Sequence, residues 1–196
     1  MKFLVMCKWP LESPYDAAVE AAASGSLTCL QYLVEEVKCK VDVHTLLCSL
    51  ENHKTKIGSK KDKGDLRCTM YIHKKLQDQG VNIQEQIKLP DLNTELYLTW
   101  INCVTDLEFQ KVRWLLAQNY IPREPVQLSE YTGEIVHKPL LLLMNSAVIA
   151  GDLEMVQLLH QNNFECNARI CQMARAAKKA EIFKYLISAY DITLKT

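Results

Sequence analysis

Apolar residues recur along several stretches of this chain at the spacing of one helix face. Behind Gly25 they fall at Leu27, Leu30, Leu33 and Val34, separations of three and four residues that place side chains on one side of a helix. The same spacing returns in three further stretches, most weakly in the first of them: Leu66, Thr69, Ile72 and His73; Leu153, Val156, Leu159 and His160; Ala180, Phe183, Leu186 and Ile187. A helical segment repeated behind a break predicts one helix-turn-helix unit used several times.

Small residues precede the first break. Ala21, Ala22 and Gly25 form an A-A-x-x-G sequence, and Ala147 with Gly151 repeats part of it. This sequence resembles the ankyrin repeat, whose T-P-L-H-x-A-A-x-x-G pattern is followed by a second helix with paired leucines. Residues 16–19 replace T-P-L-H here. The resemblance implies an all-α, ankyrin-like repeat solenoid in which small alanines let neighbouring inner helices approach closely.

The resemblance divides residues 1–196 into about five helix-turn-helix units of a single domain. We place the units at 14–36, 43–80, 94–119, 139–163 and 168–189, with breaks at Gly25, Gly64, Thr105, Gly151 and Lys178. The third unit has its inner helix at 96–104 and its outer helix at 107–118. A turn of a small hairpin is predicted at 131–134. Lys178 stands where a glycine belongs, as is common in terminal repeats that cap an array.

Charge and hydropathy narrow the class of protein. The chain has 23 basic and 23 acidic residues, so its net charge does not indicate binding to nucleic acid or to a membrane. The longest apolar run, 140–144, is far too short to span a bilayer, and the first ten residues are too weakly apolar for a signal peptide. We therefore expect a monomeric protein of the cytoplasm or nucleus that binds neither nucleic acid nor membrane.

Chemistry-bearing motifs are scarce. The eight cysteines show no C-x-x-C and no zinc spacing, so we expect reduced, structural thiols with no metal and no cofactor. No G-x-S-x-G, H-E-x-x-H, Walker-type loop or G-x-G-x-x-G is present, so we expect no enzyme. One alternative stays open: an enzyme or effector using a low-pKa cysteine on a degenerate helical scaffold. The sequence places no particular cysteine beside a particular histidine.

The resemblance implies protein binding through the concave face formed by inner helices and connecting loops, as an adaptor, inhibitor or host-interaction factor. Counted from the break at Thr105, Trp100 takes the inner-helix position that Glu20 takes before Gly25. If the third unit is instead shifted in register, Trp100 is buried. Aromatic residues suit interface hot spots, and the full set of candidate partner-binding residues is Trp9, Tyr15, Glu20, Trp100, Tyr131 and His137.

A polar insertion divides the second unit at 54–64. Its basic residues are Lys54, Lys56, Lys60, Lys61 and Lys63. Such a loop either grips an acidic partner or a phosphate, or it is a solvated insertion with no partner. A further interpretation is that the chain is a fragment of a longer array.

Overall fold

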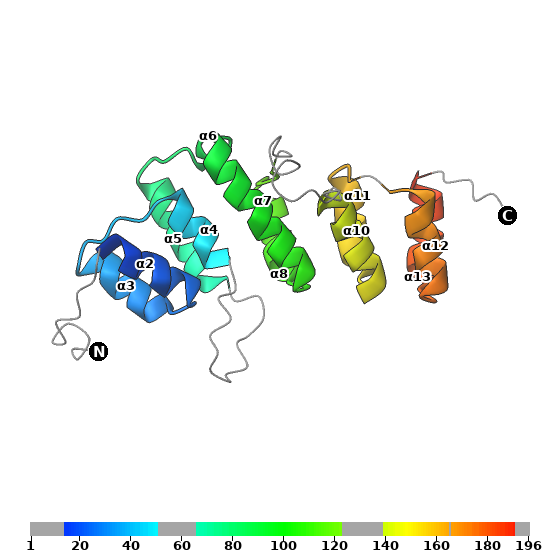
Figure 1. Ribbon diagram of the computed structural model, residues 1–196, viewed down its shortest axis with the longest axis horizontal. Helices are drawn as coiled ribbons and strands as arrows, with labels where there is room; N and C mark the ends of the chain where they lie inside the picture. The colour runs from blue at the N-terminus through cyan, green and yellow to red at the C-terminus, as the bar shows by residue number, and fades with distance from the viewer. Residues whose placement is uncertain (1–13, 51–65, 123–138, 165, 191–196) are drawn as a thin grey trace, which may run out of the picture. The chain divides into compact units, whose positions relative to one another are not determined.

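A computed structural model of the chain describes residues 14–50, 66–122, 139–164 and 166–190. These residues contain helices and no strand, which confirms the all-α prediction (Figure 1). The chain divides into two compact parts, Met1–Glu95 and Leu96–Thr196. The helices are α2 (Pro14–Ala23), α3 (Leu27–Glu35), α4 (Val43–Leu50), α5 (Arg67–Asp78), α6 (Ile83–Gln86), α7 (Pro90–Thr105), α8 (Phe109–Ala117), α10 (Pro139–Ala150), α11 (Leu153–Gln161), α12 (Ala168–Ala176) and α13 (Ala180–Tyr190).

One turn geometry joins the two helices of four pairs. In each pair, one residue between the helices has a positive φ, and the second helix begins two residues after it. We call it the left-handed residue of the pair; the four are Gly25 (φ 70°), Leu107 (56°), Gly151 (80°) and Lys178 (57°). The next amide always donates to the carbonyl five residues back. These bonds are Ser26 to Ala21 at 3.0 Å, Glu108 to Cys103 at 2.8 Å, Asp152 to Ala147 at 3.0 Å and Lys179 to Ala174 at 2.9 Å. This is a Schellman-type helix end, so these pairs share one turn.

The turn corrects the predicted register of the third pair. The predicted break at Thr105 is wrong by two residues, because the left-handed residue is Leu107. Leucine is an unfavourable residue for positive φ, and the absence of a glycine hid this turn from the sequence. The predicted break at Gly64 and the hairpin turn at 131–134 lie outside the described residues.

Burial follows the corrected register. The residue seven positions before the left-handed one is at most 1% exposed in all four pairs: Ala18, Trp100, Met144 and Cys171. The residue four positions before it is also buried: Ala21, Cys103, Ala147 and Ala174. These two positions lie on the same side of the first helix, and they form the core of each pair whatever the size of the side chain.

The residues of α4 can be matched with those of α12, because the two helices begin with the same N-cap arrangement. Asp42 Oδ1 accepts the amide of Thr45 at 2.8 Å, just as Asn167 Oδ1 accepts the amide of Ile170 at 3.1 Å. Each is an N-cap arrangement that satisfies an otherwise unpaired helical amide. The alignment matches Leu46 with Cys171, both fully buried, and places Cys48 at the position of Met173.

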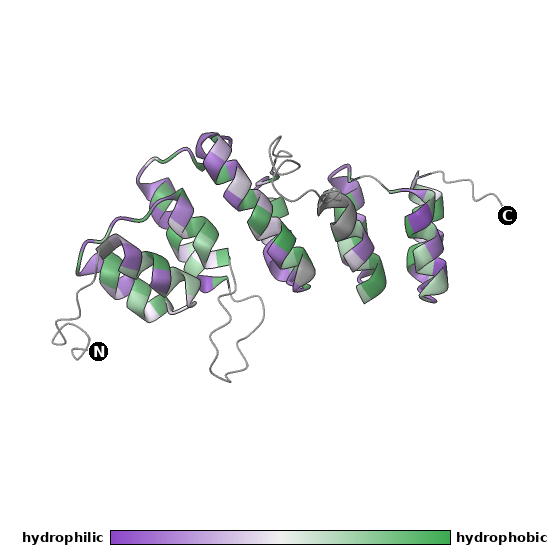
Figure 2. Cartoon of the chain, viewed as in Figure 1, coloured by the Kyte–Doolittle hydropathy of each residue, from purple (hydrophilic) through white to green (hydrophobic). Residues whose placement is uncertain are grey.

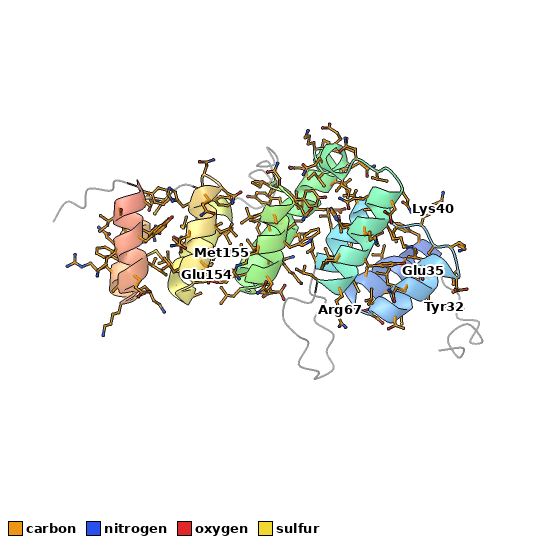
Figure 3. All side chains as sticks on the ribbon, turned by 180° about the vertical axis from the view of Figure 1, so that it is seen from behind. Tyr32, Glu35, Lys40, Arg67, Glu154 and Met155 are labelled. Atoms are coloured by element: carbon orange, nitrogen blue, oxygen red, sulfur yellow. The ribbon has the colours of Figure 1, made fainter. Side chains whose placement is uncertain are left out.

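Within the N-terminal part, one helix pair packs on the next. α2 contacts α3 and α4, α4 contacts α5, and α3 contacts α5. Glu35, labelled on α3 in Figure 3, accepts the hydroxyl of Tyr71 at 3.1 Å and lies 3.4 Å from Lys75 Nζ, both on α5. First helices therefore pack on first helices and second helices on second helices. Hydrophobic and hydrophilic residues are mixed along the helices (Figure 2). The buried residues of α5 recur at helical spacing, at Cys68, Ile72 and Leu76, as expected of a helix that packs through one face.

The C-terminal part is built in the same way. α10 contacts α11 and α12, α12 contacts α13, and α11 contacts both α8 and α13. Arg113 of α8 binds both carboxylate oxygens of Asp152 at 2.9 and 3.2 Å, while Asp152 Oδ1 caps α11 by accepting the amide of Met155 at 2.9 Å. A single carboxylate thus caps one helix and ties it to the preceding pair.

α7 is longer than the sequence predicted. The prediction started the third inner helix at Leu96, whereas α7 begins at Pro90, a residue well suited to the first position of a helix. The short helix α6 before it was not predicted, and Asn82 caps it by accepting the amide of Glu85 at 3.2 Å. The added turns of α7 supply Glu95, which contacts α4.

A glycine at Lys178 should stabilise the chain. Lys178 has φ 57° and is exposed, and left-handed backbone costs a non-glycine residue about 1–2 kcal/mol. The greater freedom of glycine in the unfolded chain offsets about 0.4–1 kcal/mol of the gain. Lys178→Gly should therefore raise the free energy of unfolding by about 0.5–1 kcal/mol, as measured by urea denaturation. A matched Lys184→Gly change within α13 should lower it by about 1 kcal/mol, and equal effects of the two changes would contradict the turn assignment.

Candidate binding surface

A row of accessible side chains runs along each first helix. In the corrected register these residues lie five and nine positions before the left-handed residue, four apart and hence on one face. None of those whose side chains the structure describes is buried. In the N-terminal part the row comprises Asp16 and Glu20 on α2 with His44 and Cys48 on α4, and we call these four residues the inner-helix stripe. The corresponding residues of the C-terminal part include Leu98, Asn102, Ser146, Arg169 and Met173.

Tyr15 links the starts of the two helices that carry the stripe. Its hydroxyl donates to Asp42 Oδ2 at 2.9 Å. Burial, followed by the hydrogen bond and negative charge of Asp42, raises the pKa of Tyr15 to about 12. Tyr15 therefore remains a neutral phenol at physiological pH, and it holds α2 and α4 together beside the stripe.

Three side chains at the α4 end of the stripe form a continuous chain of contacts. His44 Nδ1 lies 2.8 Å from Glu95 Oε2, and His44 Nε2 lies 3.5 Å from Cys48 Sγ. His44 and Cys48 meet because residues four apart on a helix share a face. Glu95 comes from the first turns of α7. The side chains of His44 and Glu95 are 39% and 36% exposed, so solvent and small molecules reach this point.

The structure distributes the predicted site residues unevenly. Glu20 is exposed on an inner helix and Tyr15 is half-buried beside it. The placement of Trp100 on the binding face is corrected: its side chain is 1% exposed and its indole N–H donates to the carbonyl of Tyr120 at 2.9 Å. In the corrected register Trp100 aligns with buried Ala18, not with Glu20. The remaining predicted residues, Trp9, Tyr131, His137, Lys54, Lys56, Lys60, Lys61 and Lys63, lie outside the described residues.

Sequence reasoning missed the contact of His44, Cys48 and Glu95. The four-residue spacing of His44 and Cys48 could have signalled their proximity on a helix. Nothing in the sequence could have added Glu95, which is 51 residues from His44. His160, the last residue of the apolar series behind Gly151, packs against α13. Its Nδ1 lies 2.7 Å from the hydroxyl of Tyr185, and the centroid of its ring is 4.6 Å from that of Tyr190.

The surroundings of the described cysteines differ. Burial raises the pKa of Cys39 and of Cys171. Burial, followed by the proximity of Cys171, raises the pKa of Cys166 to about 12. A higher pKa leaves less thiolate, which is the nucleophilic form. These three cysteines are therefore less ionised at neutral pH than a thiol of ordinary pKa.

Comparisons with known proteins return no match of any kind. No protein-family model, no curated protein and no solved structure matches the chain. Over the ranges that the structure describes, no three His, Cys, Asp or Glu side chains are grouped so as to hold a metal ion. None of the described helices is both long and apolar enough to cross a membrane.

Proposed function

We propose that the chain is a protein-binding scaffold of stacked, ankyrin-like helix pairs, and that its inner helices present the binding face. The observation that carries the proposal is the contrast between positions within the shared register. Positions seven and four before the turn are buried in every pair that can be aligned. The position five before it is accessible and chemically different each time: Glu20, Cys48, Asn102, Ser146 and Met173. A scaffold that keeps its core positions and varies its surface positions is suited to recognition of a partner.

Two further observations support the ankyrin-like arrangement. The contacts within each part run from first helix to first helix and from second helix to second helix, which is how repeats bury a continuous core. The A-A-x-x-G sequence at 21–25 places its two alanines in the core and its glycine at φ 70°. Those are the roles that close helix packing and a left-handed turn require.

The charge of the N-terminal part indicates what kind of partner surface it fits. Asp16 and Glu20 are exposed on the stripe, and Glu95 and Asp42 add carboxylates beside it. An acidic face attracts a segment rich in lysine and arginine, and it does so less strongly at high salt. We therefore propose that a basic segment of a partner protein binds to the inner-helix stripe. His44 of the stripe and the neighbouring Tyr15 would supply hydrogen-bonding groups to that segment.

A charge-reversal pair tests this proposal. Asp16→Lys together with Glu20→Lys changes the stripe, while Glu36→Lys together with Asp78→Lys makes the same change of net charge at the exposed ends of α3 and α5. The partner is first captured from the native cell with the unaltered chain and identified, and its affinity is then measured by titration at low and high salt. We expect the stripe variant to bind at least about tenfold more weakly and the control to bind within about twofold of the unaltered chain.

The same titration can contradict the proposal. Equal losses in the two variants would reduce the effect to net charge, and no loss in either would place the partner elsewhere on the chain. Circular dichroism of both variants checks that the helices are intact, since exposed helix positions seldom change stability by more than about 0.5 kcal/mol.

A further inference from the structure

Cys48, His44 and Glu95 have the geometry of a nucleophile, a base and an orienting carboxylate. Cys48 Sγ lies 3.5 Å from His44 Nε2, and His44 Nδ1 lies 2.8 Å from Glu95 Oε2. Cys48 Sγ lies beside the imidazole ring, 3.5 Å from Nε2 and 4.0 Å from Nδ1. A carboxylate only accepts hydrogen bonds, so the contact with Glu95 places a hydrogen on Nδ1, and Nε2 is the ring nitrogen nearer to the thiol. Nucleophilic thiols are activated by this arrangement, in which a third group orients the base.

Packing does not explain a cysteine at this position. In the shared register Cys48 aligns with Glu20, Asn102, Ser146 and Met173, so the scaffold accepts acidic, amide, hydroxyl and thioether side chains there. The core residues of α4 are instead Leu46 and Leu50. Cys48 is half-buried, whereas Cys39, Cys68 and Cys171 are buried. Its sulfur is therefore accessible from the stripe and is not needed to fill the core.

We propose that Cys48 is a nucleophilic thiol and a site of covalent modification by small, soft, uncharged electrophiles. His44 takes the thiol proton on Nε2, and the resulting imidazolium is stabilised by Glu95. The thiolate sulfur then attacks the electrophilic carbon, the S–C bond forms as the bond to the leaving group breaks, and the leaving group departs with the electron pair. No oxidant or reductant is required. An uncharged electrophile is favoured because two carboxylates belong to the same part of the structure: Glu95, which contacts His44, and Asp42, which caps α4.

The neighbouring titratable groups are compatible with a thiolate at Cys48. From α2 the facing group is Tyr15, a neutral phenol. Its pKa is raised to about 12 by burial, then by the hydrogen bond and charge of Asp42, and least by the charge of Cys48. From α7 the group is Glu95, which reaches Cys48 through His44. α5 meets α4 through an uncharged buried pair, in which Ser49 Oγ donates to Thr69 Oγ1 at 2.9 Å. His44 is the basic side chain in contact with the sulfur.

The pH dependence of alkylation is a better readout than its rate at one pH. A thiol whose pKa falls from about 8.5 to about 7 is about thirtyfold more ionised at pH 6. Its lower intrinsic nucleophilicity removes about a factor of five, which leaves a gain of only about sixfold. The midpoint of the pH–rate profile, however, moves by the full change in pKa.

The experiment compares Cys48 with Cys29 in the same molecule. The full chain is treated with iodoacetamide from pH 5 to 10, and mass spectrometry of digested samples gives the alkylation rate of each cysteine. Cys29 is a half-buried thiol on outer helix α3, and it serves as the internal reference. We expect the Cys48 profile to have its midpoint at least about one pH unit below that of Cys29, with an approximately sixfold faster rate at pH 6.

Three variants assign the effect to the contacts. His44→Gln removes the base and should shift the midpoint of the Cys48 profile to that of Cys29. Glu95→Gln keeps the size of the side chain but removes its charge, and it should shift the Cys48 midpoint part of the way to that of Cys29. Glu36→Gln removes an exposed carboxylate at the end of α3, outside the stripe, and should leave the midpoint unchanged. A Cys48 profile that coincides with that of Cys29 in the unaltered chain would overturn the proposal, as would a low midpoint that persists in His44→Gln.

This inference stands apart from the proposed binding function. It concerns the chemistry of one thiol and is measured on the purified chain without any partner. Loss of the low midpoint would leave the charge-reversal experiment unaffected, and failure of partner binding would leave the alkylation profile unaffected.

Discussion

Trp100→Ala should destabilise the chain by about 3–5 kcal/mol, the range found when a large buried aromatic residue is truncated. The indole is 1% exposed, lies with its ring centroid 6.2 Å from that of Phe164 in a stacked arrangement, and donates its N–H to the carbonyl of Tyr120 at 2.9 Å. Truncation removes the packing and leaves the Tyr120 carbonyl without this donor. Urea denaturation followed by circular dichroism measures the change.

Two companion variants separate the contributions of Trp100. Trp100→Phe keeps most of the apolar contact and loses the hydrogen bond, so it should cost less, about 1–3 kcal/mol. Asn102→Ala, at an exposed position of the same helix, should change stability by no more than about 0.5 kcal/mol. A Trp100→Ala protein as stable as Asn102→Ala would return Trp100 to the surface and overturn the corrected register.

Lys111→Met should cost about 3–5 kcal/mol through a different mechanism. Lys111 Nζ lies 2.8 Å from Glu108 Oε2, and the two side chains are only 3% and 2% exposed. Removing the cation leaves a buried carboxylate deprived of this partner, which is strongly unfavourable. Replacement of both charges by apolar residues of similar volume, as in Glu108→Leu with Lys111→Met, is often close to neutral.

The diagnostic result is the coupling between these two changes. The double variant should be more stable than Lys111→Met alone, and chemical denaturation of the four proteins in the cycle gives the coupling energy. If the two single changes are mild and add to the double, the ion pair is solvated and the burial at the start of α8 is wrong.

The sequence predicted the helix pairs well because their signals are local. The spacing of Leu27, Leu30 and Leu33 is sufficient to predict α3, and glycine marks the turns at Gly25 and Gly151, both of which have positive φ. The third pair was misplaced because its turn uses Leu107, which carries no local signal for left-handed backbone. The error of two residues moved Trp100 from the core to the predicted binding face.

The candidate site was less predictable than the fold. Glu20 could be placed on an exposed inner-helix face by counting back from a glycine, and the structure shows it exposed. The contact between His44 and Glu95 depends on α7 beginning at Pro90 rather than near Leu96, and on the packing of two helices far apart in sequence. Periodicity describes one helix at a time, so it gives no information on such contacts.

Site-specific photo-crosslinking tests most directly the claim that the inner helices form the binding face. A photoreactive amino acid is placed at Glu20 on α2 or at Met70 on α5, which is an exposed apolar residue of an outer helix. Each protein is irradiated in the native cell, and covalent adducts are identified by mass spectrometry. The binding proposal predicts that a partner protein is captured from position 20 and that the capture is lost when Asp16 is changed to Lys. Capture of that partner from position 70 and not from position 20 would contradict it.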